Sequence, residues 1–227
     1  GCISSDTIAA TILEPEQAFA GPDTSICQSS TPVILVGSPI SGLWSGSILV
    51  SANGEFTPSL PGEYTLTYSY GIGSCLTIDE RLITVDALPE VSVESDFDIC
   101  VSEEPLELTG TPANGLWSGT GVTNQNSGEF DPFVAGVGTH VITYQFTSTT
   151  TGCLNLDSLV ISVNPLPNVN FDSIPISCLD EPVLFSNTST GGISFEWIFG
   201  DGTTSNAENP EHIYGDTGTF EITLIAS

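Results

Sequence analysis

Six cysteines are the residues of this sequence with the clearest chemical potential, and they recur at regular intervals. The same short interval separates Cys2 from Cys27, Cys75 from Cys100 and Cys153 from Cys178. The intervals from Cys27 to Cys75 and from Cys100 to Cys153 are wider. Because no Cys-x-x-Cys motif occurs, the pattern favours disulfides formed outside the cytosol over a metal site. Buried free thiols are the alternative.

Few other residues could support catalysis. The sequence has two histidines, His140 and His212, and its single basic residue is Arg81. The absence of lysine excludes Schiff-base chemistry and lysine isopeptide crosslinks. No nucleophile elbow, His-Glu-x-x-His helix, P-loop or Cys/His zinc pattern is present. We therefore expect a protein that is not an enzyme, in which both histidines are structural.

The cysteine intervals belong to a longer internal repeat. Leu43-Trp44-Ser45-Gly46 returns further along the chain as Leu116-Trp117-Ser118-Gly119. The segment 62–68 likewise matches 138–144, and 218–224 is a looser third copy. Regular repetition of this kind is typical of a chain built from similar small modules.

The elements that would position these residues are β-strands. Apolar and polar residues alternate with a period of two, and Gly, Pro, Asn and Ser bound each segment. No segment resembles an amphipathic helix. The clearest strands are expected at residues 31–37, 63–70, 76–85, 105–109, 139–147 and 154–163. Several short strands in each repeat predict all-β sandwich modules in tandem.

Proline clusters mark the joints between modules. They lie at Leu13-Glu14-Pro15, Asp86-Ala87-Leu88-Pro89 and Asn164-Pro165-Leu166-Pro167. The predicted domains are residues 1–14 (the final strand of a preceding module), 15–88, 89–166 and 167–227. Short joints that contain proline are stiff, so we expect an extended rod.

These boundaries favour disulfides within modules. Cys27 would pair with Cys75 and Cys100 with Cys153, each bond stabilising its module by about 4 kcal/mol in the chain-entropy model. The alternative is pairing across the short intervals, which would clamp the joints. The favoured pairing gives Cys2 and Cys178 partners outside this sequence, as expected if the chain is cut from a longer array.

The charge of the chain excludes several partners. Against one basic residue stand 28 acidic ones, which gives a formal net charge of −27. Nucleic acids and anionic lipid headgroups are therefore excluded, and no apolar stretch of roughly 20 residues predicts membrane insertion. The acidic residues are expected to serve solubility, and no cofactor is required. Calcium at the joints is the alternative, with candidate ligands Asp86, Glu90, Asp96, Asp98, Asp172, Asp180 and Glu181.

The tryptophans have two candidate roles. Trp44 and Trp117 each lie in a Leu-Trp-Ser-Gly element and Trp197 in the last module. We expect them to fill the sandwich cores. Exposed sugar-stacking platforms are the alternative, and burial of all three side chains would contradict it.

The last module carries the most specific motif. Its elements are a W-x-F-G-D-G turn, an N-P-x-H-x-Y segment and a G-T-F strand, with the motif residues Trp197, Phe199, Gly200, Asp201, Gly202, Asn209, Pro210, His212 and Tyr214. Glycine at a tight turn allows positive φ, and an aspartate there can accept local backbone N–H groups. This pattern resembles the PKD domain, an immunoglobulin-like β-sandwich of extracellular proteins. The copy looks incomplete at its C-terminus.

The first two modules resemble the immunoglobulin-like repeats of very large adhesins on gliding bacteria, the SprB-like proteins exported by type IX secretion. This resemblance implies a stalk segment on the bacterial cell surface that supports adhesion and gliding motility. Its partners would be adjacent modules of the same polypeptide, and beyond them surface polysaccharide or other cell-surface proteins. The alternative is an accessory or carbohydrate-binding module of a secreted polysaccharide- or protein-degrading enzyme.

The same resemblance implies a covalent modification. In that bacterial group, O-glycans are attached to Ser or Thr between an aspartate and an aliphatic residue. Three tripeptides fit this pattern, and they give the candidate sites Thr7, Ser158 and Ser173.

Overall fold

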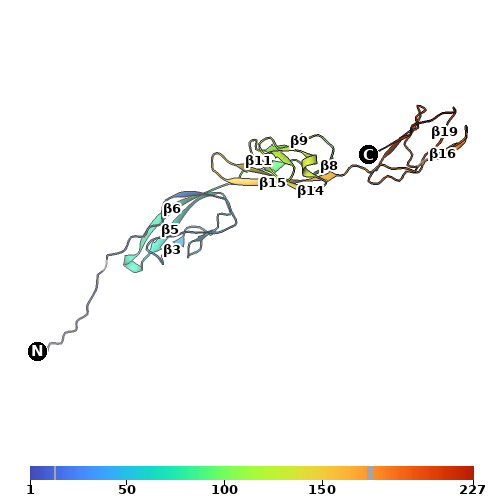
Figure 1. Ribbon diagram of the computed structural model, residues 1–227. Coiled ribbons are helices and arrows are strands. Elements are labelled where there is room, and N and C mark those ends of the chain that lie inside the picture. Colours follow the sequence, from blue (N-terminus) through green and yellow to red (C-terminus); the bar gives the residue numbers. More distant parts are fainter. Residues whose placement is uncertain (13, 173–175) are drawn as a thin grey trace. The chain divides into compact units, whose positions relative to one another are not determined.

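The structure, a computed structural model, describes residues 1–12, 14–172 and 176–227. Its strands fall into three consecutive groups along the chain, as the coloured ribbon of Figure 1 shows. The predicted all-β fold of tandem β-sandwich modules is confirmed. We call the groups the first module (β1–β6), the second module (β7–β15) and the third module (β16–β20).

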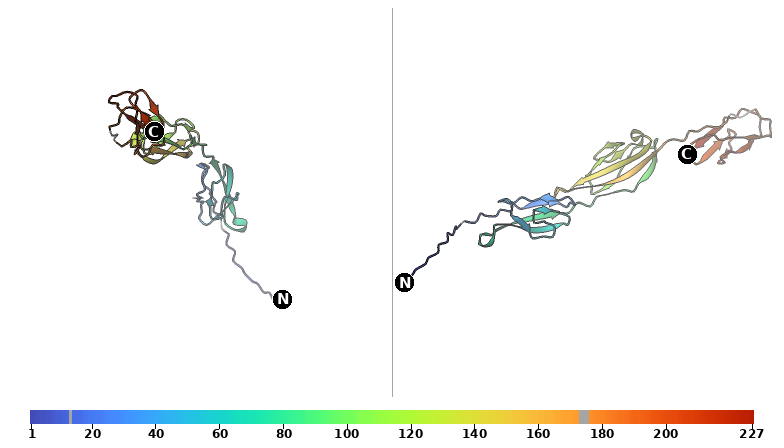
Figure 2. Two further views of the ribbon diagram at one scale, coloured as in Figure 1. Left: turned by 90° about the vertical axis from the view of Figure 1, so that its right-hand side faces the viewer. Right: turned by 90° about the horizontal axis from the view of Figure 1, so that it is seen from below.

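Residues 1–12 contain neither helix nor strand, and all of them are exposed. Figure 2 draws this segment, in dark blue, as a plain trace. No strand forms in the described residues of the range 1–14, and the prediction that this range is the final strand of a preceding module stays a prediction, because its partner strands would lie outside this sequence. A strand needs a neighbouring strand to take its backbone hydrogen bonds, and Ile3, Ile8 and Ile12 have no sheet on which to pack.

The first module pairs one four-stranded sheet with one two-stranded sheet. The larger sheet has the order β1 (Thr24–Cys27), β6 (Thr77–Asp86), β5 (Gly62–Tyr70) and β3 (Leu43–Ser45). The smaller sheet pairs β2 (Val33–Ile34) with β4 (Glu55–Phe56). A 3₁₀ turn, η1 (Gly73–Cys75), connects β5 to β6. β1 runs parallel to β6, and this register sets Cys27 opposite Asp86.

The second module repeats this plan. Its larger sheet has the order β8 (Phe97–Cys100), β15 (Leu154–Asn164), β14 (Gly138–Thr147) and β11 (Leu116–Ser118). β9 (Leu106–Glu107), β13 (Glu129–Phe130) and β12 (Val122–Asn124) form a second sheet, and β7 (Ser92–Val93) pairs with β10 (Gly110–Thr111). β8 runs parallel to β15, which sets Cys100 opposite Asn164.

One short helix, α1 (Pro132–Ala135), follows β13. The Asp131 carboxylate caps it by accepting the N–H groups of Phe133 at 2.9 Å and Val134 at 3.3 Å. Proline at the first helical position and Gly136 at its end are favourable for such a turn. A single turn is too short to produce an amphipathic period, so no helical signal is visible in the sequence at this position.

The third module is smaller. β16 (Pro182–Leu184) pairs with β19 (Glu211–Ile213), and β17 (Phe195–Ile198) lies between β18 (Thr204–Ser205) and β20 (Thr223–Ala226). Its core consists of Val183, Phe185, Trp197, Phe199 and Leu224.

The tryptophans are core residues, as expected. Trp44, Trp117 and Trp197 are 4%, 3% and 0% exposed, so a role as sugar-stacking platforms is wrong. Trp44 packs on Tyr68 with ring centroids 5.0 Å apart, and Trp117 packs on Tyr144 at 4.6 Å. Each equivalent pair faces across adjacent strands, an arrangement that stabilises a sandwich core.

Both tyrosines also organise the loop before the tryptophan strand. The Tyr68 hydroxyl donates to the carbonyl of Pro39 and accepts the N–H of Gly42 at 2.8 Å. In the second module Tyr144 donates to the carbonyl of Pro112 and accepts the N–H of Gly115 at 2.7 Å. One phenol therefore satisfies two backbone groups in each of the first two modules.

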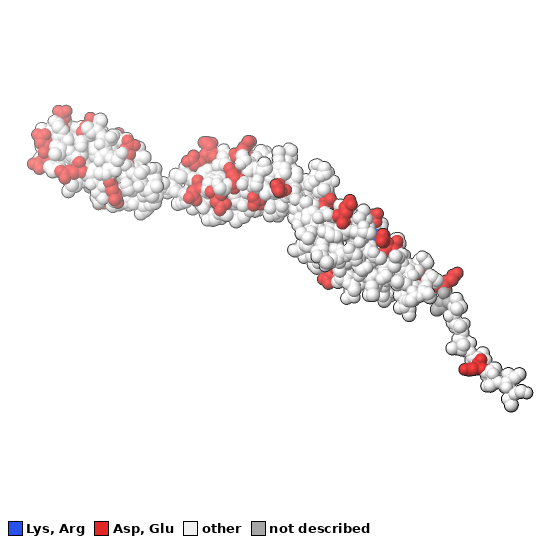
Figure 3. Space-filling model, turned by 180° about the vertical axis from the view of Figure 1, so that it is seen from behind, with Lys and Arg blue, Asp and Glu red and all other residues white. Residues whose placement is uncertain are grey.

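The chain divides into two compact units. The first comprises residues 1–90 and 146–155, and the second comprises residues 91–145 and 156–227. The turn between β14 and β15 thus belongs to the first unit. On the face seen in Figure 3, acidic side chains are spread over the molecule and do not gather in one patch. Within the described ranges, no helix is both long and apolar enough to cross a membrane.

Candidate functional site

A disulfide joins Cys27 to Cys153, 126 residues further along the chain. Their Cα atoms lie 5.5 Å apart, a normal separation for a disulfide. Cys27 is the last residue of β1, and Cys153 lies in the turn just before β15. Both residues belong to the compact unit formed by residues 1–90 and 146–155. The bond thus connects a strand of the first module to the long hairpin of the second.

The hairpin turn that carries Cys153 is held by further hydrogen bonds. The N–H of Ser148 donates to the carbonyl of Cys153 at 2.8 Å, and the N–H of Gly152 donates to the carbonyl of Ser148 at 2.8 Å. The amide of Asn155 donates to the carbonyl of Pro89 at 2.9 Å, in the proline joint after the first module. Cys153 itself is completely buried. The disulfide therefore lies in a contact that is also stabilised by hydrogen bonds and by burial of Cys153.

The predicted pairing of Cys27 with Cys75 is wrong, because the two residues lie at opposite ends of β6. Cys27 is opposite Asp86, the last residue of this strand, while Cys75 precedes its first residue, Thr77. Ten residues of strand span about 30 Å, whereas disulfide-bonded Cα atoms lie about 4.4–6.8 Å apart.

The predicted pairing of Cys100 with Cys153 is wrong for the same reason, since the whole length of β15 lies between them. In the described part of the chain, four cysteines are unpaired and exposed: Cys2, Cys75, Cys100 and Cys178. The alternative pairing across the short intervals is therefore not formed either.

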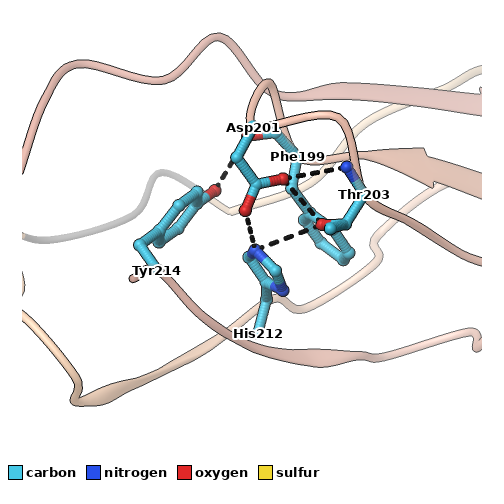
Figure 4. Close-up of polar contacts among 5 residues, drawn as sticks. All are labelled: Phe199, Asp201, Thr203, His212 and Tyr214. Carbon is cyan, nitrogen blue, oxygen red and sulfur yellow. Dashed lines mark hydrogen bonds and ion pairs between the residues drawn. The ribbon is translucent and has the colours of Figure 1, made fainter. Parts of the chain in front are cut away.

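A second cluster of interacting groups lies at the turn between β17 and β18. Gly200 and Gly202 have φ values of 81° and 90°, as the predicted tight turn requires. Between them, Asp201 Oδ1 accepts the N–H of Thr203 at 3.0 Å and its hydroxyl at 2.6 Å. Asp201 Oδ2 lies 2.7 Å from Nε2 of His212, a residue of β19 (Figure 4). One carboxylate thus holds the turn and a neighbouring strand together.

These contacts change the acidity of two groups. The hydroxyl of Thr203 is the main cause that lowers the pKa of Asp201 to about 2, with burial opposing it and His212 adding to the effect. Burial, and secondly the charge of Asp201, raise the pKa of Tyr214. The Tyr214 hydroxyl donates to the carbonyl of Phe199 at 3.1 Å.

The contacts around Asp201 and His212 are typical of a structural role, because they hold neighbouring segments of the module together. The His212 ring stacks on Phe199, with centroids 4.2 Å apart and planes 5° from parallel, and it meets the edge of Tyr214. Asn209 Oδ1 accepts the N–H of Asn187 at 2.9 Å, while Pro210 is buried and its carbonyl accepts the N–H of Phe185. These motif residues therefore find their partners within the module. The hairpin turn was predicted from the Gly-Asp-Gly sequence, whereas the Asp201–His212 pair was not.

The other candidate residues are not brought together. His140 lies on β14, where Nε2 is 2.8 Å from the carbonyl oxygen of Gly136, which supports a structural role. Among the described residues, no group of three or more His, Cys, Asp or Glu side chains is placed to hold a metal ion. Asp96, a candidate calcium ligand, instead accepts the N–H of Val160 at 2.8 Å.

The candidate glycosylation sites differ in their surroundings. Thr7 is exposed in the N-terminal segment without strands. Ser158 is exposed on β15, and its hydroxyl is 3.0 Å from that of Thr143. Ser173 lies outside the described residues.

Comparison with known families identifies the third module. Residues 164–227 match the model of the PKD domain. A segment of 61 residues is 38% identical to collagenase ColA of Bacillus cereus; it covers 25% of this chain and only 6% of the collagenase. The matched range contains both the Asp201 turn and the core around Trp197.

Solved structures of other multidomain proteins also align with the chain. The EC1–4 segment of Drosophila N-cadherin aligns at 10% identity with a TM-score of 0.31, over 81% of this chain and 64% of that structure. Three immunoglobulin domains of titin align at 14% identity with a TM-score of 0.33, over 94% of this chain and 88% of that structure.

Proposed function

We propose that this chain is a non-catalytic segment of an extracellular stalk built from immunoglobulin-like and PKD modules. The observation that carries the proposal is the bond between Cys27 and Cys153, which ties one module to the next. A disulfide that tethers neighbouring modules limits how far they can separate, which is useful in a spacer. Stable disulfides also favour an oxidising location outside the cytosol.

The wider features of the chain support the same role. The first two modules have equivalent sheets, cores, tyrosine contacts and long hairpins, which supports the proposal that the partners of each module are the adjacent modules of the same polypeptide. A formal charge of −27 keeps such an array soluble and makes parallel copies repel each other. We assign the stalk to a cell-surface adhesin of the gliding-motility type, because of the resemblance of the first two modules to those repeats.

Surface labelling of the source organism tests this function. Antibodies raised against the purified chain are expected to label intact cells, and brief protease treatment of those cells should remove the label. Deletion of the modules should reduce attachment of cells to glass while the protein is still exported. Recovery of the antigen only in the culture medium, in one polypeptide with a hydrolase domain, would contradict the stalk.

A second candidate function rests on the likeness to collagenase ColA. In that case the modules would accompany a secreted degradative enzyme and hold it near an insoluble substrate. Cosedimentation of the purified chain with collagen fibrils, and separately with cellulose or chitin, tests this alternative. Binding to one of these polymers at micromolar concentration would favour the accessory role, while its absence from all pellets would favour the stalk.

Two smaller proposals accompany the stalk. Calcium binding at the joints is tested by isothermal titration with CaCl₂, where a titratable heat and a higher melting temperature are expected if it occurs. O-glycosylation at Thr7, Ser158 or Ser173 predicts that protein from its native source has a mass above that of the polypeptide. A bare polypeptide mass would refute it.

A further inference from the structure

Cys100 occupies the same structural position in the second module as Cys27 does in the first. Each is the last residue of a strand that runs parallel to the final long strand of its module. The residue after Cys27 donates its N–H to Asp86 at 2.8 Å, and the residue after Cys100 donates to Asn164 at 2.9 Å. Asp86 and Asn164, which lie opposite the two cysteines, are each the first residue of a proline joint. We call Cys27 and Cys100 the strand-end cysteines.

Cys75 and Cys153 are equivalent in the same way. Each lies in the turn between the two longest adjacent strands of its module, β5 and β6 or β14 and β15. We call them the hairpin cysteines. The Cys27–Cys153 bond joins the strand-end cysteine of the first module to the hairpin cysteine of the second module, the next along the chain. Cys75 and Cys100 are the unpaired members of the two classes, and both are exposed.

We propose that Cys100 and Cys75 each bond to a neighbouring module, Cys100 to the third module and Cys75 to a module before the first, in the way that Cys27 bonds to Cys153. The partner of Cys100 is a hairpin cysteine of the module that follows the second module. The partner of Cys75 is a strand-end cysteine of a module before the first. This inference rests on the oxidising location given by the proposed function.

The direction of the bond argues against pairing of Cys75 with Cys100. In the observed bond, the strand-end cysteine comes from the earlier module and the hairpin cysteine from the later one. Cys75 and Cys100 have the opposite order, with the hairpin cysteine in the earlier module. A bond between them would need a different contact between modules from the one that the described residues form.

The strand register locates the expected partner of Cys100. Trp44, Trp117 and Trp197 face Tyr68, Tyr144 and Leu224 respectively across the adjacent strand. The hairpin cysteine follows this facing residue by 7 positions in the first module and by 9 in the second. In a polypeptide that continues past Ser227, the partner is therefore expected about 7 to 9 positions after Leu224.

Formation of each bond requires a two-electron oxidant. A dithiol–disulfide oxidant of the secretory compartment supplies it: the thiolate of Cys100 attacks one of its sulfurs, and a mixed disulfide forms. The thiolate of the partner cysteine then displaces the oxidant. The two protein thiols lose two protons and two electrons, and the oxidant leaves as a dithiol.

Disulfide mapping of the full-length protein from its native source tests the inference. Free thiols are blocked with N-ethylmaleimide at harvest, and the unreduced protein is cut with a Glu-specific protease, because its one basic residue makes trypsin unsuitable. The expected result is a peptide of Cys100 linked to a peptide from outside residues 1–227, together with the Cys27–Cys153 peptide. A Cys75–Cys100 peptide, or Cys100 recovered as the maleimide adduct, would overturn it.

Matched variants assign the partner. In the full-length protein denatured in urea without reductant, Cys27→Ser is expected to make Cys153 reactive to N-ethylmaleimide, and Cys100→Ser should free one cysteine of the third module instead. If Cys100→Ser exposes no new thiol, the inference fails while the stalk stands, provided that Cys27 and Cys153 remain linked. If Cys27 and Cys153 are themselves reduced in the native protein, the oxidising location fails, and the inference fails with it.

Discussion

The imidazole of His212 lies 2.7 Å from the carboxylate of Asp201 and links the β17–β18 turn to β19. Both side chains are largely covered, at 14% and 19% exposure. The carboxylate accepts three hydrogen bonds when those from Thr203 are included. The turn is therefore held mainly through the charged form of one acid.

The first prediction concerns the pH dependence of this turn. Because the pKa of Asp201 falls from 3.8 to about 2 on folding, its contribution to stability is complete above pH 3.8 and is lost as the pH falls through about 2. Asp201→Asn should therefore lower the melting temperature of the third module at pH 7. The difference from the unmodified chain should shrink between pH 4 and pH 2.

The NMR signal of the Trp197 indole reports unfolding of this module, since Trp197 lies in its core. Asp216→Asn, at an exposed position of the same module, is the control. An equal loss of stability in both variants at pH 7 would contradict a specific role of Asp201.

The second prediction concerns the disulfide. Replacing both Cys27 and Cys153 with serine should reduce the free energy of unfolding by up to about 4–5 kcal/mol, the chain-entropy value for a loop of roughly 100 residues. Urea denaturation without reductant measures this change. In the isolated chain of residues 1–227, Cys75→Ser removes an exposed, unpaired thiol and should change the stability by less than about 0.5 kcal/mol. Similar losses in the two proteins would refute the observed pairing.

The third prediction compares two glycines with the same backbone conformation. Gly128 and Gly152 have φ values of 76° and 75°, so alanine strains the backbone equally at both, by about 1–2 kcal/mol. A Cβ atom at Gly128 would lie 2.5 Å from Nε1 of the buried Trp117, whereas at Gly152 it would meet nothing within 4 Å. Gly128→Ala should therefore lose about 1–3 kcal/mol more than Gly152→Ala in urea denaturation. Equal losses would show that the Trp117 contact is not limiting.

The fourth prediction concerns the tyrosine contacts. Tyr144→Phe removes the acceptor of the Gly115 N–H and the donor to the Pro112 carbonyl, so it should cost about 1–3 kcal/mol of unfolding free energy. Tyr68→Phe should behave alike. Tyr64→Phe is the control, because its hydroxyl makes one exposed hydrogen bond, to Leu60. If Tyr64→Phe lowers the free energy of unfolding as much as Tyr68→Phe and Tyr144→Phe do, the hydrogen bonds of Tyr68 and Tyr144 to the preceding loop make no specific contribution to stability.

The long strands could be predicted from the sequence, but the short ones less well. Segments 63–70, 76–85, 139–147 and 154–163 agree closely at both ends with β5, β6, β14 and β15. Their side chains alternate over many residues because one face packs on a core. Segment 31–37 shrinks to Val33–Ile34, since its partner β4 offers only Glu55 and Phe56 to pair with. The length of an edge strand depends on its neighbour, which local sequence does not describe.

The disulfide could not be predicted from spacing. Intervals along the chain do not say at which end of a module a cysteine lies, and the parallel pairing of β1 with β6 decides this for Cys27. The Asp201–His212 contact was missed for a related reason. It joins a turn to a strand through the folding of the whole module, and its sequence signal was the motif that contains both residues.

The disulfide also determines which part of the polypeptide can be stretched. When the chain is pulled from its two ends, tension passes from Cys27 through the sulfur atoms to Cys153, and the residues between them form a closed ring that carries none of it. About 125 residues are shielded in this way, equal to about 400 Å of extended chain. Reduction of the Cys27–Cys153 bond would allow this length of chain to be extended. In an array where each strand-end cysteine is bonded to the next hairpin, successive rings would overlap, and most of the protein could not be unravelled without first breaking sulfur–sulfur bonds.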